Sequence, residues 1–220
     1  MVHKHRKIHE PYGSSRKACA HVWQTYHVNQ PDQYIRTVID TGETFLAICF
    51  TQEQAELWPK VHAIQMDMNY KKITGRAGQV EHEVIFGGRV GLEGQFLALA
   101  RAYMSSQDAP AYEDLFRELF NCLERQCGVR VRWQHIHKEG LFGLTLDQDA
   151  AAIKDNSRLV DWLEHKKSAF ISCGLSRAYS MLSRRGWNTL SEDTNGVESL
   201  HEQSYKAGGR YTSLQHAMDS

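Results

Sequence analysis

Three acidic residues stand where an apolar run ends or a helix is predicted to begin. Asp67 ends the run VHAIQMD, Asp147 ends the run LFGLTLD, and Glu198 lies in the first turn of a predicted helix within NGVESLHEQSY. Strands usually exclude aspartate, because a charge beside a packed sheet is costly unless it has a partner or a task. The three acids are therefore candidates for one shared site.

Carboxylates that converge on one point repel each other unless a cation neutralises them. Mg²⁺ and Mn²⁺ prefer oxygen ligands and are commonly held by a few carboxylates, with water and a substrate phosphate completing the shell. Two such ions, roughly 3.5–4 Å apart, can activate water and stabilise the leaving oxygen of a phosphodiester. The chemistry that these acids predict is therefore two-metal cleavage or strand transfer of a nucleic acid.

Each acid also has a structural interpretation. Asp147 precedes a predicted helix and could be its N-cap, while Asp149 could complement the helix dipole or replace Asp147 as the second acid. The segment from Asn195 to Glu198 resembles a capping box, which would explain Glu198 without chemistry. Asp67 has the weakest structural alternative, because little at the end of a strand demands aspartate.

Further polar residues lie near the three acids in the sequence. His201 follows Glu198 by three residues, so it could touch a metal site or orient water, although a solvated helix histidine is the commoner interpretation. Lys71 and Lys72 follow Asp67, and Arg184 and Arg185 end a basic stretch. These four side chains are candidates for contacts with backbone phosphates.

The acids need strands and a helix to bring them together. Hydrophobic alternation predicts three strands in series, and helical periodicity predicts an amphipathic helix with a proline in its first turn and a glycine after its end. Turns are expected at 72–78 and at the Gly87–Gly88 pair. The full set is strands at 61–67, 83–90, 96–104, 141–146 and 169–173, helices at 109–127, 149–165 and 177–185, a last helix around 197–205, and an extended segment VRVRWQHIH.

An antiparallel meander followed by alternating helices and strands predicts an α/β fold. The order matches the ribonuclease H-like layout, a mixed sheet of three antiparallel strands plus parallel strands, flanked by helices. In that layout Asp67 and Asp147 come from neighbouring strands. Glu198 comes from a helix that crosses near their ends.

The bulk composition fits one domain with a short arm. The chain has 220 residues, a formal net charge of zero and five cysteines, an odd number that argues against a disulfide framework. No apolar run approaches the roughly 20 residues of a membrane span, so a nuclear or cytoplasmic protein is expected. Residues 1–20 are predicted to be a basic flexible arm, residues 21–60 an N-terminal extension with a hairpin at TVIDTG and TFLAICF, and residues 61–220 the core.

Several segments resemble the Mutator-like (MULE) transposase domain in its divergent fungal form. They are QMDMNYKKITG, EVIFGG, LALARAYMSSQDAPAYEDLFRELF, HIHKEGLFGLTLDQDAAA and DTNGVESLHEQSY. The resemblance implies a DDE-type transposase core in which Asp67, Asp147 and Glu198 are the catalytic acids and bind Mg²⁺ or Mn²⁺. It also implies DNA partners (transposon ends and target), allows a homo-oligomer, and places the active protein of a eukaryote in the nucleus.

The chain departs from the family pattern in two respects. The family carries Cys-x-x-His after the second acid, whereas this chain has Cys173-Gly-Leu-Ser176. The family also has zinc domains on either side of the core, and here the sequence stops at Ser220, which leaves open a truncation at the C-terminus. The alternative function is therefore a catalytically inactive, transposase-derived DNA-binding relic.

Overall fold

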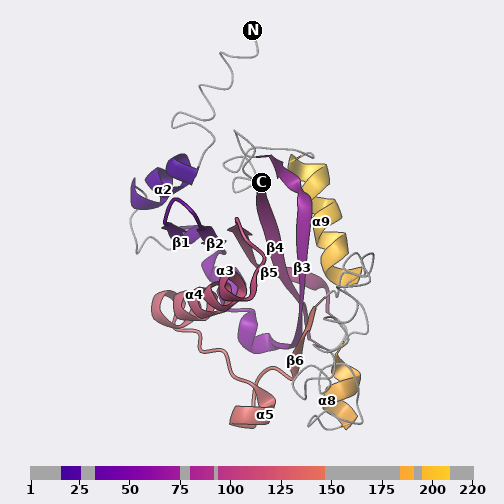
Figure 1. The fold of residues 1–220 in the computed structure, drawn as a ribbon. Coiled ribbons are helices and arrows are strands. Elements are labelled where there is room, and N and C mark those ends of the chain that lie inside the picture. The colour runs from indigo at the N-terminus through magenta and orange to yellow at the C-terminus, as the bar shows by residue number, and fades with distance from the viewer. Residues whose placement is uncertain are drawn as a thin grey trace, which may run out of the picture.

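Six strands form one mixed sheet in the order β1-β2-β5-β4-β3-β6 (Figure 1). The structure is a computed structural model that describes residues 16–25, 33–74, 80–91, 94–146, 184–190 and 195–208. The strands are β1 Ile35–Asp40, β2 Phe45–Cys49, β3 Val61–Thr74, β4 Val80–Val90, β5 Phe96–Met104 and β6 Gly143–Leu146. The helices are α2 Arg16–Thr25, α3 Gln52–Ala55, the 3-10 helix η1 Trp58–Lys60, α4 Ala109–Cys127, α5 Gln134–His137, α8 Arg184–Thr189 and α9 Asn195–Gly208.

The strand pairing confirms the predicted meander. Strands β3, β4 and β5 are antiparallel in series, and β6 pairs with β3 in parallel. The parallel register runs from Ala63 opposite Gly143 to Met66 opposite Leu146. The hairpin β1–β2 joins the same sheet through β5, so the predicted hairpin of the N-terminal extension is part of the central sheet.

One face of the sheet carries the main apolar core, which α3, η1 and α4 cover. Leu115, Leu119 and Leu123 of α4 pack on alternate residues of the strands and are fully buried. Burying one such side chain contributes roughly 1.5–3 kcal/mol. The helix boundaries agree with the prediction: Pro110 lies in the first turn, and Gly128 ends the helix with a φ of 68° that favours glycine.

The opposite face is shared by two helices. Helix α2 covers β1 and β2 through Cys19, which packs with Ile35 and Phe45. Helix α9 lies across β3 and β4, where Val197 and Leu200 pack on Ile85. Figure 1 shows α4 and α9 on opposite sides of the sheet. Asp67, Glu83 and Arg101 lie on this opposite face, where the two acids also contact His201 of α9.

The structure differs from the sequence predictions at several boundaries. Residues 16–20, assigned to the arm, belong to α2, because Ala18 and Cys19 are buried against the hairpin. Strand β3 continues to Thr74, so the turn predicted from Lys72 does not begin there. The segment VRVRWQHIH forms a β-bridge at Trp133 and then the short helix α5.

The Gly87–Gly88 pair lies inside β4 and not in a turn. A Cβ atom on Gly87 would stand 2.3 Å from the ring of Phe96, and one on Gly88 would stand 3.1 Å from Leu99 and from Val61. The two glycines are thus explained by the close approach of neighbouring side chains. The helix predicted at 149–165 and the strand predicted at 169–173 lie outside the described residues.

No helix within the described part of the chain is both long enough and apolar enough to cross a membrane.

Candidate functional site

Strand β3 and helix α9 bring Asp67 and His201 into contact. Side chains alternate along β3, so Gln65 and Asp67 share the face that α9 covers. Helix α9 buries Val197, Leu200 and His201, which recur at helical spacing on one side. The Nε2 atom of His201 lies 3.3 Å from Oδ2 of Asp67. The histidine is only 5% exposed, so its interpretation as a solvated helix residue was wrong.

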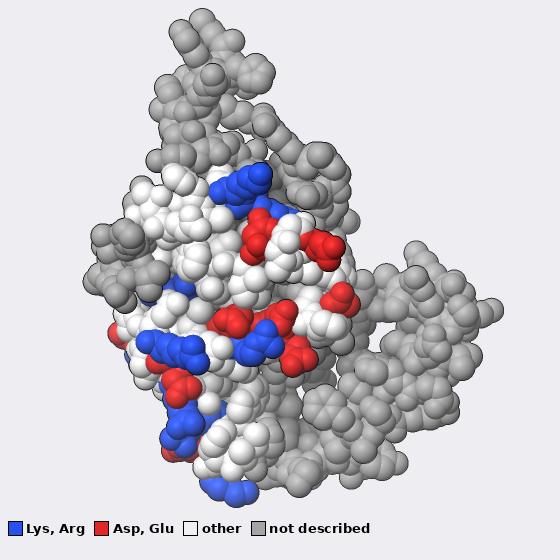
Figure 2. Space-filling view, turned by 60° about the vertical axis from the view of Figure 1, so that its left-hand side comes forward, with Lys and Arg blue, Asp and Glu red and all other residues white. Residues whose placement is uncertain are grey.

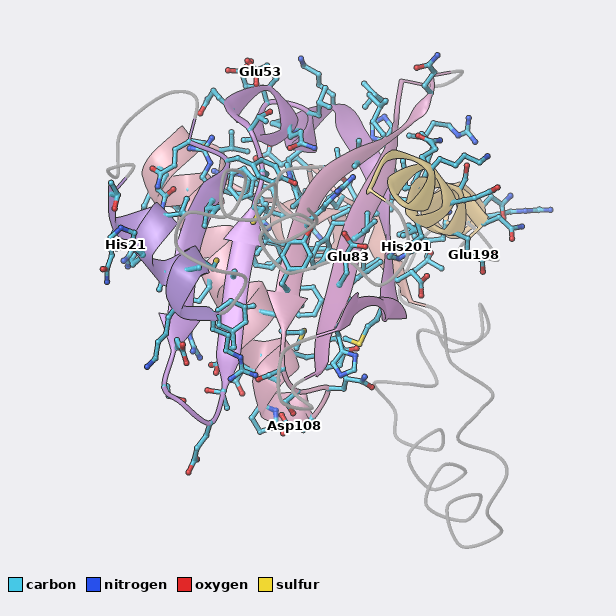
Figure 3. The ribbon with its side chains drawn as sticks, turned by 90° about the horizontal axis from the view of Figure 1, so that it is seen from above. His21, Glu53, Glu83, Asp108, Glu198 and His201 are labelled. Carbon is cyan, nitrogen blue, oxygen red and sulfur yellow. The ribbon has the colours of Figure 1, made fainter. Side chains whose placement is uncertain are left out.

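A second carboxylate lies on the other side of the imidazole. Glu83 of β4 is fully buried, and its Oε2 is 3.6 Å from Nδ1 of His201. The Tyr103 hydroxyl donates a hydrogen bond of 3.2 Å to Glu83 Oε1, and a guanidinium nitrogen of Arg101 lies 3.9 Å from the same oxygen. In Figure 3, Glu83 lies in the sheet next to His201 on α9. These residues form one polar network that ends at Asp67.

The two facing carboxylates favour the charged form of His201. A neutral imidazole donates from only one ring nitrogen, whereas the imidazolium donates from both. Burial lowers the pKa of His201, but the contacts with Asp67 and Glu83 outweigh burial and hold that pKa above its ordinary value. When His201 is protonated, it and Arg101 give the network two cations that face the carboxylates of Asp67 and Glu83, which offsets the cost of burying charge.

The hydroxyl of Tyr103 stays protonated in this network. Burial and the adjacent charge of Glu83 raise the pKa of Tyr103 well above its ordinary value. The group therefore serves as a hydrogen-bond donor to Glu83.

Both oxygens of the Asp67 carboxylate are engaged. Oδ1 accepts a 2.8 Å hydrogen bond from the backbone N–H of Met68, and Oδ2 faces His201. The side chain nevertheless remains 18% exposed. A carboxylate has about four lone-pair positions. Asp67 therefore retains acceptor capacity toward solvent for a cation.

The other two predicted acids are placed differently. Glu198 is exposed on α9, and Figure 3 places it farther from the sheet than His201. Asp147 and its alternative Asp149 lie outside the described residues. Within the described ranges, no group of three or more His, Cys, Asp or Glu side chains is arranged to hold a metal ion. A site formed by the three acids remains a prediction.

The predicted phosphate contacts fall on two elements. Lys71 and Lys72 lie in the second half of β3, beyond Asp67, and Arg184 and Arg185 lie at the start of α8. On the face that Figure 2 shows, lysine and arginine are interspersed with aspartate and glutamate among the described residues. That face therefore offers no argument for nucleic-acid binding.

Sequence reasoning did not identify Glu83, Arg101 and Tyr103 as parts of the site. The sequence does contain one indication of this site. Arg101 interrupts the otherwise apolar segment FLALARAYM, and a charged side chain in a buried strand requires a partner of opposite charge. Glu83 shares the alternation phase of Ile85 and is opposite Tyr103 in the β4–β5 pairing. The pairing of these strands would have suggested the contact.

A close approach fixes the beginning of α9 over the sheet. A Cβ atom on Gly196 would stand 2.8 Å from Oε1 of Gln65 and 2.8 Å from the ring of Phe96. The same ring packs over Gly87 of β4. The absence of a side chain at position 196 thus allows α9 to lie close enough for His201 to reach Asp67 and Glu83.

Comparison with protein-family models, with curated protein sequences and with solved structures gave no match.

Proposed function

We propose that this chain is a metal-dependent nuclease or strand-transfer core of the DDE transposase class, built on a ribonuclease H-like sheet. The observation that carries the proposal is the parallel pairing of β3 with β6. Its last registered pair is Met66 and Leu146, the residues that immediately precede Asp67 and Asp147 in the chain. Helix α9, which carries Glu198, lies across β3 and β4.

In the proposed site, Asp67, Asp147 and Glu198 would bind Mg²⁺ or Mn²⁺. Asp67 fits this role, because its carboxylate is held at both oxygens and is still partly exposed. Glu198 is exposed and lies three residues from His201, on an adjoining part of the α9 surface. Bound divalent ions would supply an activated water or 3′-hydroxyl nucleophile and stabilise the leaving oxygen. The chain's own contribution is to hold the carboxylates in place.

DNA would lie along the outer part of β3 and α8. Lys71 and Lys72 follow Asp67 on the same strand, and Arg184 and Arg185 begin α8. In this proposal they contact backbone phosphates of transposon ends and target, which would place the active protein of a eukaryote in the nucleus. Neutralising these residues would flatten the salt dependence of DNA binding.

The test compares Asp67→Asn with Asp40→Asn, a matched change at the end of β1. Asp40 also ends a strand, and its Oδ1 accepts from the backbone of Gly42 in an exposed turn. We expect Asp67→Asn to reduce Mn²⁺-dependent nicking of supercoiled DNA by more than about 100-fold, because even outer partners of metal ligands typically contribute 10–100-fold. Asp40→Asn should cut like the unaltered protein. Equal cutting by both variants would rule out a catalytic role for Asp67.

A second candidate, a DNA-binding relic without catalysis, is favoured by one contact. His201 already lies against Oδ2 of Asp67, and its protonated form would compete with a metal ion there. This candidate predicts salt-sensitive DNA binding that neither Mn²⁺ nor Asp67→Asn alters. It also predicts no cleavage by the unaltered protein.

A further inference from the structure

We propose that Glu83 and His201 act as a positioning pair for Asp67. Glu83 holds the imidazole from the sheet side, and the imidazole in turn holds one oxygen of the Asp67 carboxylate. The contacts themselves are independent of any activity, whereas their catalytic meaning rests on the proposed function. Neither residue is given a direct role in the chemistry.

Glu83 is a fixed point in the fold. It is 0% exposed on β4 and is opposite Tyr103 on one neighbouring strand and Asn69 on the other. The Tyr103 hydroxyl and the Arg101 guanidinium both face Oε1 of Glu83. A charge buried this deeply is costly unless its partners are well placed. Oε2 remains directed to the imidazole of His201.

His201 has little freedom to turn between its two acidic partners. Its ring nitrogens face acids from two different strands, Nδ1 toward Glu83 and Nε2 toward Asp67. The helix that carries it is anchored by Val197 and Leu200, and its first turn is packed on Phe96. Rigid elements with fixed partners place a functional group more exactly than loops do.

The carboxylate of Asp67 is held at both of its oxygens. The Met68 N–H fixes Oδ1 and His201 fixes Oδ2, so rotation of the carboxylate would break one contact or both. Among the described residues, the hydrogen bond from the Met68 N–H would remain without His201. Outer partners that orient a ligating group typically contribute 10–100-fold to metal affinity or activity.

Two substitutions separate the two halves of the pair. The amide nitrogen of asparagine reaches about the position of histidine Nδ1, and that of glutamine reaches about the position of Nε2. His201→Asn therefore keeps a donor toward Glu83 and loses the donor toward Asp67, whereas His201→Gln does the reverse. Both variants replace the imidazole with the same neutral amide group, so each is the control for the other.

The metal-free experiment measures how strongly Asp67 and residue 201 are coupled. Urea unfolding gives the effect of Asp67→Ala on the unfolding equilibrium in the unaltered, His201→Gln and His201→Asn backgrounds. We expect the factor by which Asp67→Ala changes the unfolding equilibrium constant to be about tenfold smaller in the His201→Asn background than in the unaltered protein, with the His201→Gln background between the two. An equal effect in all three would overturn the proposal. If His201→Asn does not fold, Glu83→Gln takes its place, with the same expectation and the same contrary result.

The second experiment measures Mn²⁺ binding by calorimetry and DNA nicking with the same variants. We expect His201→Asn to weaken Mn²⁺ binding by about 10–100-fold. We expect His201→Gln to weaken it less, because glutamine keeps the donor toward Asp67 and loses only the contact with Glu83. Equal losses in both would overturn the positioning role. An unaltered protein that neither binds Mn²⁺ nor cuts DNA would instead overturn the proposed function. In that case the unfolding experiment would still show whether Glu83 and His201 hold the Asp67 carboxylate.

Discussion

The hydroxyl of Tyr103 lies 3.2 Å from Oε1 of Glu83, and both side chains are fully buried. Burying a carboxylate without hydrogen-bond donors is destabilising, because the lost hydration is not replaced. Here a hydroxyl from the adjacent strand replaces part of that hydration, and His201 and Arg101 face the same carboxylate. The central strands therefore carry a charge in a region that the alternation pattern would fill with apolar side chains.

Tyr103→Phe tests how much this hydroxyl contributes. The substitution keeps the ring and removes one donor to Glu83, so we expect the free energy of unfolding to fall by about 1–3 kcal/mol. Urea unfolding followed by tryptophan fluorescence would measure the change. Tyr112→Phe is the comparison, a second hydroxyl deletion at a part-buried tyrosine, whose hydroxyl donates to the sulfur of Met68 over 3.9 Å. A loss no larger than that of Tyr112→Phe would show that Glu83 does not depend on Tyr103.

Gly196→Ala tests the close approach of α9 to the sheet. Alanine favours a helix by up to about 1 kcal/mol over glycine, so a permissive site would gain stability. Here the added methyl group would meet Gln65 and Phe96 at 2.8 Å, and overpacking of this kind costs typically 1–3 kcal/mol. We expect a net loss in the free energy of unfolding, together with weaker coupling between His201 and Asp67.

Ser199→Ala is the control for Gly196→Ala. Ser199 is exposed on the same helix, so its replacement changes helix propensity without adding a contact. Its effect should lie within about 0.5 kcal/mol. If Gly196→Ala were as stable as Ser199→Ala, the approach of α9 would not depend on the glycine.

The elements of this fold were predictable where the signal is local. Helix α4 runs over the predicted residues 109–127, because apolar periodicity, Pro110 and Gly128 all act within one segment. Strand β5 also runs over the predicted residues 96–104, as a run that is apolar apart from Arg101 and is bounded by polar residues. In both, neighbours in the sequence supply the whole signal.

The site was predictable only in part, because its contacts join distant segments. Asp67 was identified as an acid in an apolar segment, a feature of the local sequence. The role of Glu83 depends on the register of β4 with β5 and on the angle at which α9 crosses the sheet. The same tertiary placement turns His201 from a solvated helix residue into a buried one. Such placement overrides what the local pattern indicates for each residue alone.

Asp108 provides a test of pH dependence away from the site. Its Oδ1 accepts a 2.9 Å hydrogen bond from the Ala111 N–H at the beginning of α4, and Ser106 donates to Oδ2 over 2.8 Å. The backbone contact with Ala111 and then the hydroxyl of Ser106 lower the pKa of Asp108 below its ordinary value. A lowered acid pKa contributes stability above the pKa of the unfolded chain, and that contribution is lost as pH falls through the folded pKa.

Asp108→Asn keeps an acceptor for Ala111 and cannot ionise, so it isolates the charge. We expect the unaltered protein to be modestly more stable than Asp108→Asn at pH 7, because the carboxylate is the stronger acceptor and lies at a helix N-terminus. The difference should begin to shrink as the pH falls below about 4, where aspartate in the unfolded chain becomes protonated, and it should vanish below the lower pKa of folded Asp108. Asp108→Ala, which lacks the acceptor, should be less stable than Asp108→Asn by the same amount at every pH. Urea unfolding at pH 7, 5 and 3 measures both differences. A constant difference between the unaltered protein and Asp108→Asn over this range would show that the charge of Asp108 does not stabilise α4.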